Sequence, residues 1–220
     1  MCGIFGITIS PSSSLSSYEI KSLISKIFLL SERRGKDASG LLSILPSRIN
    51  VLKSPMRASH LIKSHEFKRI IKVALQNYDL GESFSFLGHT RMVTGGTEQL
   101  NYNNQPVIKD KATVVHNGII VNEHDVLKSK NLSKNYDVDS EILISLFNEN
   151  LEKGHSHSKA FQMAINLVKG ANTFALCSTD SDEIFLHSSN KSLYLFHDKN
   201  LKISVFSSEK NVLESTLEKL

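Results

Sequence analysis

A cysteine follows the initiator methionine directly, as Cys2 of a 220-residue chain. Initiator methionine is normally removed before a small side chain, and its removal would leave Cys2 with a free α-amine. That amine has a pKa of roughly 7.7–8.0, so much of it is unprotonated near neutral pH. A thiol nucleophile and a base would then stand on one residue, which is the chemistry of hydrolases activated at their N-terminus. The sequence predicts that Cys2 is such a nucleophile and that a chain keeping Met1 is inactive.

An ordinary structural role is the alternative for Cys2 and for each of the other candidate residues. Cys2 could be a small apolar side chain near a chain end, and Arg91 could be a surface charge at the end of a strand. Asn117-Gly118 is typical of a two-residue hairpin turn. Asp139 precedes a helical apolar pattern and is expected at the N-cap position of that helix. The joint occurrence of these residues, in this order, favours a functional site.

Taken together, the chain resembles the class II glutamine amidotransferase domain, a member of the N-terminal nucleophile (Ntn) hydrolases. The segments that carry the resemblance are Cys2-Gly3-Ile4-Phe5-Gly6, Arg34-Gly35-Lys36-Asp37, Gly88-His89-Thr90-Arg91, His116-Asn117-Gly118, Asp139-Ser140-Glu141 and Ser207-Ser208-Glu209. The resemblance spans nearly the whole chain. It implies an α+β fold, a four-layer αββα sandwich of two mostly antiparallel sheets between helical layers. We expect residues 1–220 to form one such domain, with no synthase domain.

The resemblance also implies an activity, the hydrolysis of the glutamine side-chain amide to glutamate and ammonia. Cys2 would attack the amide carbonyl and form a glutamyl thioester, with its own α-amine as the base. A negative oxygen develops at that carbonyl, so hydrogen-bond donors must be in place around it. By resemblance, these donors are the side-chain amide of Asn117 and the backbone N–H of Gly118.

Recognition of glutamine requires groups for both of its charged ends. By resemblance, Arg91 binds the α-carboxylate, for which its planar guanidinium is suited, and Thr94 adds a further contact on that side. Asp139 and the carbonyl of Gly118 would bind the α-ammonium. Two further residues, Arg34 and Asp37, match positions that frame the nucleophile in related domains.

The ammonia acceptor and the subfamily stay open. Met92 and Gly95 depart from the amino-sugar branch, whereas Gly88-His89-Thr90-Arg91 resembles it. The segment 34–40 looks more like the purine-pathway amidophosphoribosyl transferases, and the segment 104–106 leans toward the purine and asparagine enzymes. We expect a glutaminase that feeds ammonia to a separate synthase subunit. The alternatives are a self-sufficient hydrolase of glutamine or another γ-glutamyl amide, and a regulatory relic that binds glutamine without turnover.

Composition narrows the class of protein. A hydrophobic share of 40% and a charged share of 22% are ordinary for a globular protein. We expect no membrane span, no signal peptide and no nucleic-acid binding, because no long apolar run occurs and the net charge of +4 is scattered.

Two cysteines, Cys2 and Cys177, form no disulfide framework and suit the cytoplasm. No cofactor or metal is expected, because His155 and His157 lack ligand partners. The oligomeric state, a homo-oligomer included, stays open.

Hydrophobic periodicity predicts the elements that must position these residues. Strands are expected at 2–9, 40–45, 48–53, 84–90, 112–116, 119–121, 172–179, 182–188, 192–197 and 201–207. Helices are expected from a capping box at Ser16 and Glu19 to about Leu30, and at 58–78, 123–129, 140–153, 157–169 and 209–219. The polar loop 95–106 is the candidate lid over bound glutamine.

Overall fold

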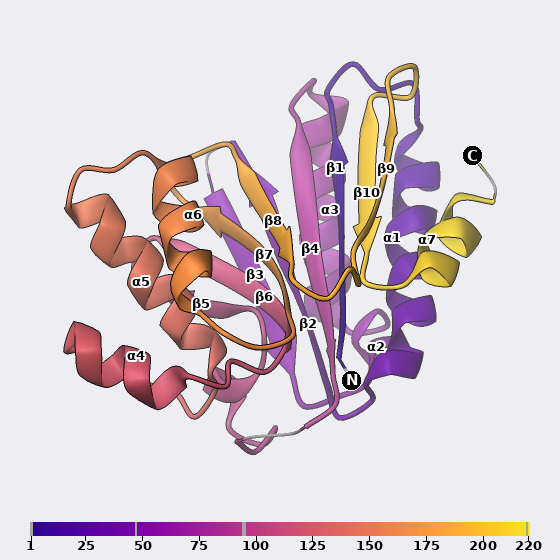
Figure 1. Ribbon diagram of the computed structural model, residues 1–220. Helices are drawn as coiled ribbons and strands as arrows, with labels where there is room; N and C mark the ends of the chain where they lie inside the picture. Colours follow the sequence, from indigo (N-terminus) through magenta and orange to yellow (C-terminus); the bar gives the residue numbers. More distant parts are fainter. Residues whose placement is uncertain (1, 47, 94–95, 219) are drawn as a thin grey trace.

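In the computed structural model, which describes residues 2–46, 48–93, 96–218 and 220, two antiparallel sheets stack face to face (Figure 1). The larger sheet has the order β3(Arg48–Ser54), β2(Ala38–Leu45), β4(Phe84–Arg91), β1(Gly3–Ile9), β10(Ile203–Ser207) and β9(Tyr194–Asp198). The smaller sheet has the order β5(Val107–Lys109), β6(Ala112–Gly118), β7(Asn172–Ser178) and β8(Ile184–Ser188). β1 therefore lies inside the larger sheet, between β4 and β10.

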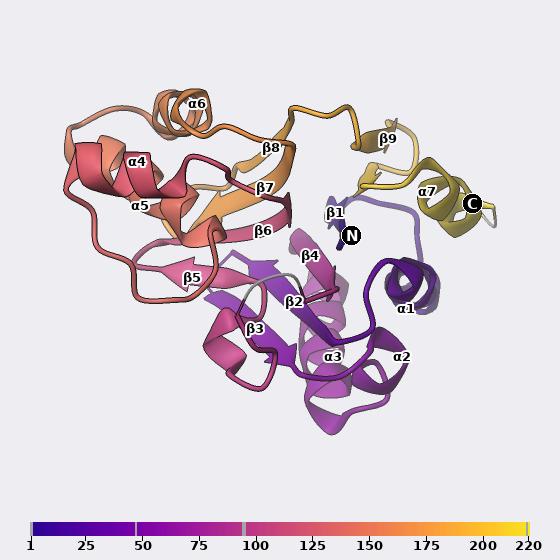
Figure 2. The same cartoon turned by 60° about the horizontal axis from the view of Figure 1, so that its bottom comes forward.

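Helices cover the outer face of each sheet. The larger sheet packs against α1(Ser17–Ser31), α2(Ala58–Leu61), α3(His65–Asp79) and α7(Lys210–Leu217). The smaller sheet packs against α4(Glu123–Lys130), α5(Ser140–Glu152) and α6(His157–Leu167), and Figure 2 shows the two helical groups on opposite sides of the sheets. The four-layer αββα arrangement expected from the resemblance is confirmed. None of the helices described is long and apolar enough to cross a membrane.

Side-chain alternation along β1 explains its place between two cores. Phe5, Ile7 and Ile9 point toward the helices, whereas Ile4 points toward the smaller sheet. Both sets are buried, whereas Thr8, on the same face as Ile4, is exposed, so β1 is covered on both faces only near its start. An added Cβ at Gly88 of the neighbouring strand would lie 2.1 Å from the Phe5 ring. Glycine in β4 thus makes room for the aromatic side chain of β1.

Side-chain hydrogen bonds of Ser16 and Ser64 mark where two helices begin, and the helix start at Ser64 corrects the prediction. The capping box is confirmed: the Ser16 hydroxyl accepts from the Glu19 N–H, and the Glu19 carboxylate accepts from the Ser16 N–H. The single helix expected at 58–78 is wrong, because the chain forms two helices, α2 and α3. The Ser64 backbone is extended, and its hydroxyl accepts from the Phe67 N–H at 3.1 Å. Ser64 therefore begins a new helix.

The predicted hairpin at Asn117-Gly118 is also wrong. Gly118 is the last residue of β6 and pairs with Asn172 of β7, and residues 119–121 form no strand. The partner of β6 on its other side is β5, a strand of three residues that the sequence pattern did not reveal. β6 thus pairs with β5 through a two-residue turn at Asp110-Lys111, and with the distant strand β7 on its other side.

One hydrogen bond joins the two sheets across their buried interface. His89 of β4 is completely buried, and its Nε2 donates to the backbone carbonyl of His116 in β6 at 3.1 Å. Burial lowers the pKa of His89 to about 3, and the charge of Arg91 acts in the same direction. His89 is therefore neutral in the folded protein over the physiological pH range, whereas its pKa in the unfolded chain is roughly 6.5.

Replacing Phe28 by alanine should lower the free energy of unfolding by about 3–5 kcal/mol, as is typical for a buried aromatic side chain. Phe28 is buried in α1 and packs edge-to-face on Phe5 and Phe67, with ring centroids 4.7 and 5.4 Å away. Urea unfolding measures the change. Leu29→Ala is the matched control, because Leu29 is 47% exposed on the same helix. Equal losses for the two variants would contradict this account of the core.

Acidification should destabilise the protein through His89. Below its unfolded pKa of roughly 6.5 the unfolded chain binds a proton that the folded chain rejects, so stability falls with decreasing pH. For a folded pKa of about 3, the loss between pH 7 and pH 5 is about 2 kcal/mol. His89→Gln keeps a donor for the His116 carbonyl but does not titrate. The unfolding free energy of His89→Gln, measured in urea at both pH values, should therefore fall by about 2 kcal/mol less between pH 7 and pH 5 than that of the wild type.

Candidate active site

A cavity of about 210 Å³ lies where strand ends of the two sheets meet. Its lining includes Cys2 just before β1, Arg91 at the end of β4, Gly118 at the end of β6 and Asp139 just before α5. The volume is below the roughly 300–1,000 Å³ of sites for drug-sized ligands, which suits a ligand as small as an amino acid. The fold thus gathers into one cavity four of the residues selected from the sequence.

Cys2 is partly buried at this cavity and is held by two contacts. Its thiol donates to the Met92 carbonyl at 3.5 Å, and its own carbonyl accepts from Arg34 Nε at 3.1 Å. Burial raises the pKa of the Cys2 thiol, and this effect outweighs the opposing hydrogen bond to Met92 and the charges of Arg91 and Arg34. The thiol is therefore protonated near neutral pH, so attack by this sulfur requires a base.

The segment 34–37 fixes both Cys2 and the exit of β4. The Asp37 carboxylate accepts from the Val93 N–H at 2.8 Å, and the Asp37 N–H donates to the Arg91 carbonyl at 3.1 Å. An added Cβ at Gly35 would lie 2.2 Å from the Arg91 carbonyl carbon, so only glycine allows this approach. Arg34 thus contacts Cys2, Asp37 contacts the chain at Arg91 and Val93, and neither residue lines the cavity.

Arg91 is nearly buried and is oriented by neighbouring oxygen atoms. One of its terminal nitrogens donates to Asn104 Oδ1 at 2.7 Å, and the other to the Gly96 carbonyl at 3.4 Å. Asn104 is itself buried and donates to the Glu98 carbonyl at 2.7 Å. Burial lowers the pKa of Arg91, but an arginine stays cationic in proteins. The cavity therefore has one fixed positive charge.

Asp139 turns its carboxylate away from the helix that it precedes. Asp139 stands at the N-cap position of α5, as expected, but its backbone is helical and its side chain makes no capping hydrogen bond. Instead, Oδ2 accepts from the Ile120 N–H at 2.7 Å, and Oδ1 lies 3.6 Å from His116 Nδ1. Burial alone would raise the pKa of Asp139, but the contacts with His116 and Ile120 outweigh burial and lower it. An ionised carboxylate therefore lines the cavity.

Asn117 and Gly118 end strand β6, and Gly118 lines the cavity that contains Cys2, whereas Asn117 is not among the lining residues. Val115 belongs to the apolar cluster between the sheets, and alternation places the Asn117 side chain on that same face, toward the sheet that carries Cys2. In the described part of the structure the Asn117 amide makes no hydrogen bond with another protein group, and the side chain is 5% exposed. Gly118 has a φ of +148°, and an added Cβ would lie 2.1 Å from the Ala171 carbonyl oxygen.

A buried polar network in the wall of the cavity was not predicted from the sequence. The Gln105 side chain accepts from the His116 N–H and donates to the His116 carbonyl at 3.0 Å. The His116 ring contacts Ser140 Oγ through Nδ1 and Asn172 Oδ1 through Nε2, both at 2.9 Å. It also stacks on Phe174. The sequence signal was the Asn104-Gln105-Pro106 segment, which pointed only to the subfamily.

Thr94 lies outside the described residues, as does Gly95 at the base of the predicted lid. Within the same loop, Asn103 is buried and exchanges two hydrogen bonds of 3.0 Å with Asp137. Asp137 and Glu123, which the sequence did not single out, line the cavity together with Asp139. The far half of the predicted lid is therefore attached to the cavity wall, while a lid function of the loop stays a prediction.

Two histidines outside this cavity were considered as metal ligands. His155 is exposed, and His157 Nε2 lies 2.8 Å from Asp180 Oδ1. Among the residues that the structure describes, no group of three or more His, Cys, Asp or Glu side chains is placed to hold a metal ion. Cys177 is buried between the sheets, where burial raises its pKa to about 12, so it is a core residue.

Comparison with known sequences supports a glutamine-dependent family. A family model described as a glutamine amidotransferase domain matches residues 89–215. Similar proteins include the isomerizing glutamine–fructose-6-phosphate aminotransferases of Oceanobacillus iheyensis and Bacillus subtilis, each 26% identical over 87% of this chain. The enzyme of Chlamydia abortus is 29% identical over the same share. The chain spans 29% of the length of these three relatives.

Solved structures add the fold. Glutamine phosphoribosylpyrophosphate amidotransferase from B. subtilis, complexed with ADP and GMP, aligns with 98% of this chain and 43% of its own, with a TM-score of 0.69 at 18% identity. A structure described as the allosteric regulatory enzyme of purine biosynthesis gives a TM-score of 0.71 at 16% identity over the same shares. Since the family model covers more than half of the chain and the fold agrees, the chain belongs to the class II glutamine amidotransferases, within the Ntn hydrolases.

Proposed function

We propose that the chain is a glutaminase, which hydrolyses the side-chain amide of glutamine and hands the ammonia to an acceptor. One observation carries the proposal: the cavity that contains the Cys2 thiol is also lined by a buried guanidinium and an ionised carboxylate. These groups, Arg91 and Asp139, are complementary to the two charged ends of an amino acid. Glutamine then presents its amide group to the nucleophile.

Recognition is assigned to groups that are already oriented. The Arg91 guanidinium, held by Asn104, binds the α-carboxylate, with Thr94 as a further contact. Asp139 and the Gly118 carbonyl bind the α-ammonium. Because these hydrogen bonds fix the donors before the ligand arrives, little ordering free energy is lost on binding.

Catalysis begins with a proton transfer within one residue. After Met1 is removed, the free amine of Cys2 takes the thiol proton, and the thiolate attacks the amide carbon of glutamine. The oxyanion that forms accepts hydrogen bonds from the Asn117 amide and the Gly118 N–H. The ammonium group of Cys2 returns the proton to the leaving nitrogen, the C–N bond breaks, and ammonia departs from a glutamyl thioester.

The second half of the reaction restores the enzyme. The same amine deprotonates a water molecule, which attacks the thioester, and the C–S bond breaks to release glutamate and the Cys2 thiol. Arg34 holds the Cys2 carbonyl and Asp37 holds the chain after Arg91, so both act as positioning residues.

The acceptor lies beyond the described cavity. Since the relatives are longer enzymes that include an aminotransferase of fructose 6-phosphate, we propose a synthase that receives the ammonia, on a separate subunit or domain. Reduced Cys2 and Cys177 support a cytoplasmic protein.

A diazo-ketone analogue of glutamine should alkylate the protein once, at Cys2. An intact mass spectrum should show loss of Met1 and one adduct per chain. Cys2→Ala should give no adduct, whereas Cys177→Ala should label like the wild type, because Cys177 is buried away from the cavity. An adduct that persists in Cys2→Ala, or full glutaminase activity of a chain verified to keep Met1, would refute the mechanism.

Asn117→Ala should lower kcat for glutamine hydrolysis by about 10²–10³, since one oxyanion donor is lost. The KM for glutamine should change little, because Asn117 acts on the transition state. Coupled detection of glutamate measures both constants. Asn200→Ala, at an exposed turn residue between β9 and β10, is the control and should keep wild-type kinetics. A parallel rise in KM with unchanged kcat would assign Asn117 to binding instead.

A further inference from the structure

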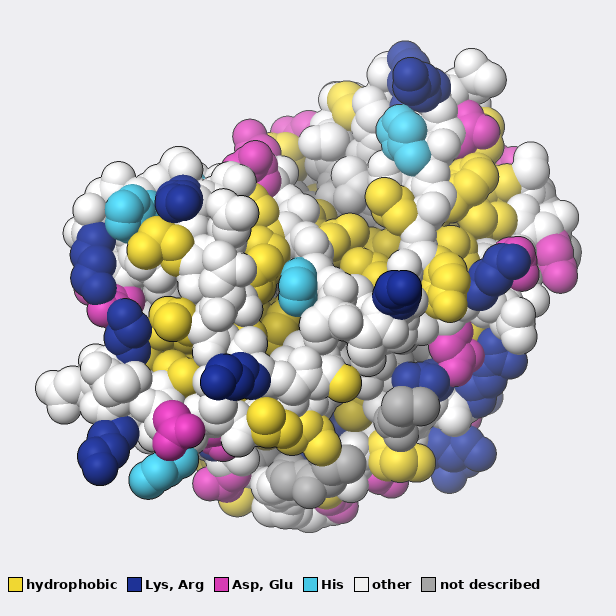
Figure 3. All heavy atoms as spheres, in the orientation of Figure 1, with side chains coloured by type: hydrophobic (Ala, Val, Ile, Leu, Met, Phe, Trp, Pro, Cys, Tyr) yellow, Lys and Arg dark blue, Asp and Glu magenta, His cyan; other side chains and the backbone are white. Residues whose placement is uncertain are grey.

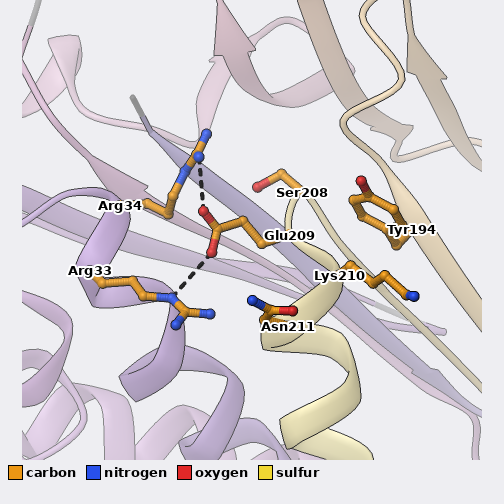
Figure 4. A pocket seen from close by; sticks show the side chains of 7 residues that line it. All are labelled: Arg33, Arg34, Tyr194, Ser208, Glu209, Lys210 and Asn211. Carbon is orange, nitrogen blue, oxygen red and sulfur yellow. Dashed lines mark hydrogen bonds and ion pairs between the residues drawn. The ribbon is translucent and has the colours of Figure 1, made fainter.

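A second cavity, of about 480 Å³, lies between the end of α1 and the start of α7. Its lining includes Arg33, Arg34, Ser208, Glu209 and Lys210, which Figure 4 shows converging from the two ends of the chain. The cavity is more than twice as large as the one that contains Cys2. No step of glutamine hydrolysis described above uses it.

Positive charge is in excess in this cavity. Arg33, Arg34 and Lys210 line it together with one carboxylate, that of Glu209. Glu209 bridges the two arginines, whereas the Lys210 side chain points away from Glu209 (Figure 4). Glu209 Oε2 lies 3.1 Å from Arg33 Nε, and Oε1 lies 2.9 Å from an Arg34 terminal nitrogen. Lys210 also lies 3.4 Å from Glu214, but both of these side chains are well exposed, so that pair is weak. Figure 3 shows charges of both signs over α1 and α7.

Hydrogen-bond donors in the cavity outnumber the acceptors that use them. Each arginine has five N–H donors, and Glu209 engages one nitrogen of each. The Tyr194 hydroxyl and the Asn211 amide also line the cavity, and within the described residues neither makes a side-chain hydrogen bond. Such a set of arginine, hydroxyl and amide donors matches the oxygen atoms of a phosphate group.

Two contacts connect this cavity to the nucleophile. Arg34 Nε donates to the Cys2 carbonyl at 3.1 Å, while the same guanidinium contacts Glu209. Ser208 exchanges hydrogen bonds with Ile4: its N–H donates to the Ile4 carbonyl at 2.8 Å, and its hydroxyl accepts from the Ile4 N–H at 3.1 Å. A ligand that fixes Arg34 and the 208–209 segment would therefore also fix residues 2–4.

We propose that this cavity binds a phosphate-bearing small molecule, and that its occupancy accelerates the reaction of Cys2 through Arg34 and Ser208. The binding site stands on its own geometry, whereas the effect on Cys2 rests on the proposed glutaminase function. A phosphate group has a charge of about −1.5 to −2 near neutral pH and presents three acceptor oxygens, which suits the excess of cations and donors. With residues 2–4 fixed by the bound ligand, the Cys2 sulfur is in position to attack for a larger fraction of the time, so the rate of its reaction rises.

Titration calorimetry with inorganic phosphate and with glucose 6-phosphate tests the site, and the comparison separates free phosphate from a phosphate ester. Arg33→Gln should weaken binding by about tenfold or more, since a charge-assisted contact is lost. Lys26→Gln is the matched control: it removes one positive charge and one α1–α7 ion pair, with Glu218, outside the cavity. Lys210→Gln provides a second cavity variant. Absent binding, or equal affinity in all variants, would overturn the site.

The rate of Cys2 alkylation by the diazo-ketone tests the coupling. Saturating ligand should raise this rate at least about fivefold over sodium chloride at equal ionic strength, and Arg33→Gln should show no such rise at the same ligand concentration. An unchanged rate in the wild type with ligand bound would overturn the coupling. If the untreated protein is not alkylated at all, the glutaminase proposal fails, while the calorimetric titration still decides the phosphate site.

Discussion

The pairing of β1 on both of its edges is the constraint on which the site depends. Chain ends ordinarily fray, yet Gly3 pairs with Thr90 of β4, and Phe5 pairs with both Gly88 of β4 and Ser207 of β10. The strand is also covered on both faces near its start. A residue that immediately precedes such a strand is therefore anchored to the sheet. In the proposed mechanism, this anchoring positions Cys2 as a nucleophile whose base belongs to the same residue.

Around this fixed strand, buried hydrogen bonds orient the other functional groups. Asn104 accepts a hydrogen bond from the guanidinium of Arg91. The Gln105 side chain bonds both the backbone N–H and the carbonyl of His116, which precedes Asn117 and Gly118 at the end of β6. Buried polar groups are costly unless they are paired, so each satisfied pair favours one arrangement of the site. The network thus limits the conformations of the cavity side chains and orients the hydrogen-bond donors before a substrate enters.

Local features of the fold could be predicted from the sequence, and features that depend on distant partners could not. The Ser16–Glu19 capping box involves neighbours in the chain and was found. The split of one predicted helix at Ser64 was missed, because the apolar period continues across the break. The turn signal at 117–118 was misleading, since pairing with β7 overrides it. Asn104 and Gln105 contact residues that no spacing rule connects to them. The family resemblance located Cys2, Arg91 and Asp139, and the structure places all three in one cavity.

The hydrogen bonds between Ile4 and Ser208 join residues that are 204 positions apart. A ribosome adds roughly 5–20 residues each second, so the first strand leaves it roughly 10–40 s before its partner β10 exists. During this interval the beginning of the chain has no sheet edge on the β10 side and stays open to the enzymes that trim nascent proteins. In the proposed mechanism, removal of Met1 can therefore precede the enclosure of Cys2, and the closing of the sandwich by the last strand marks the end of that opportunity.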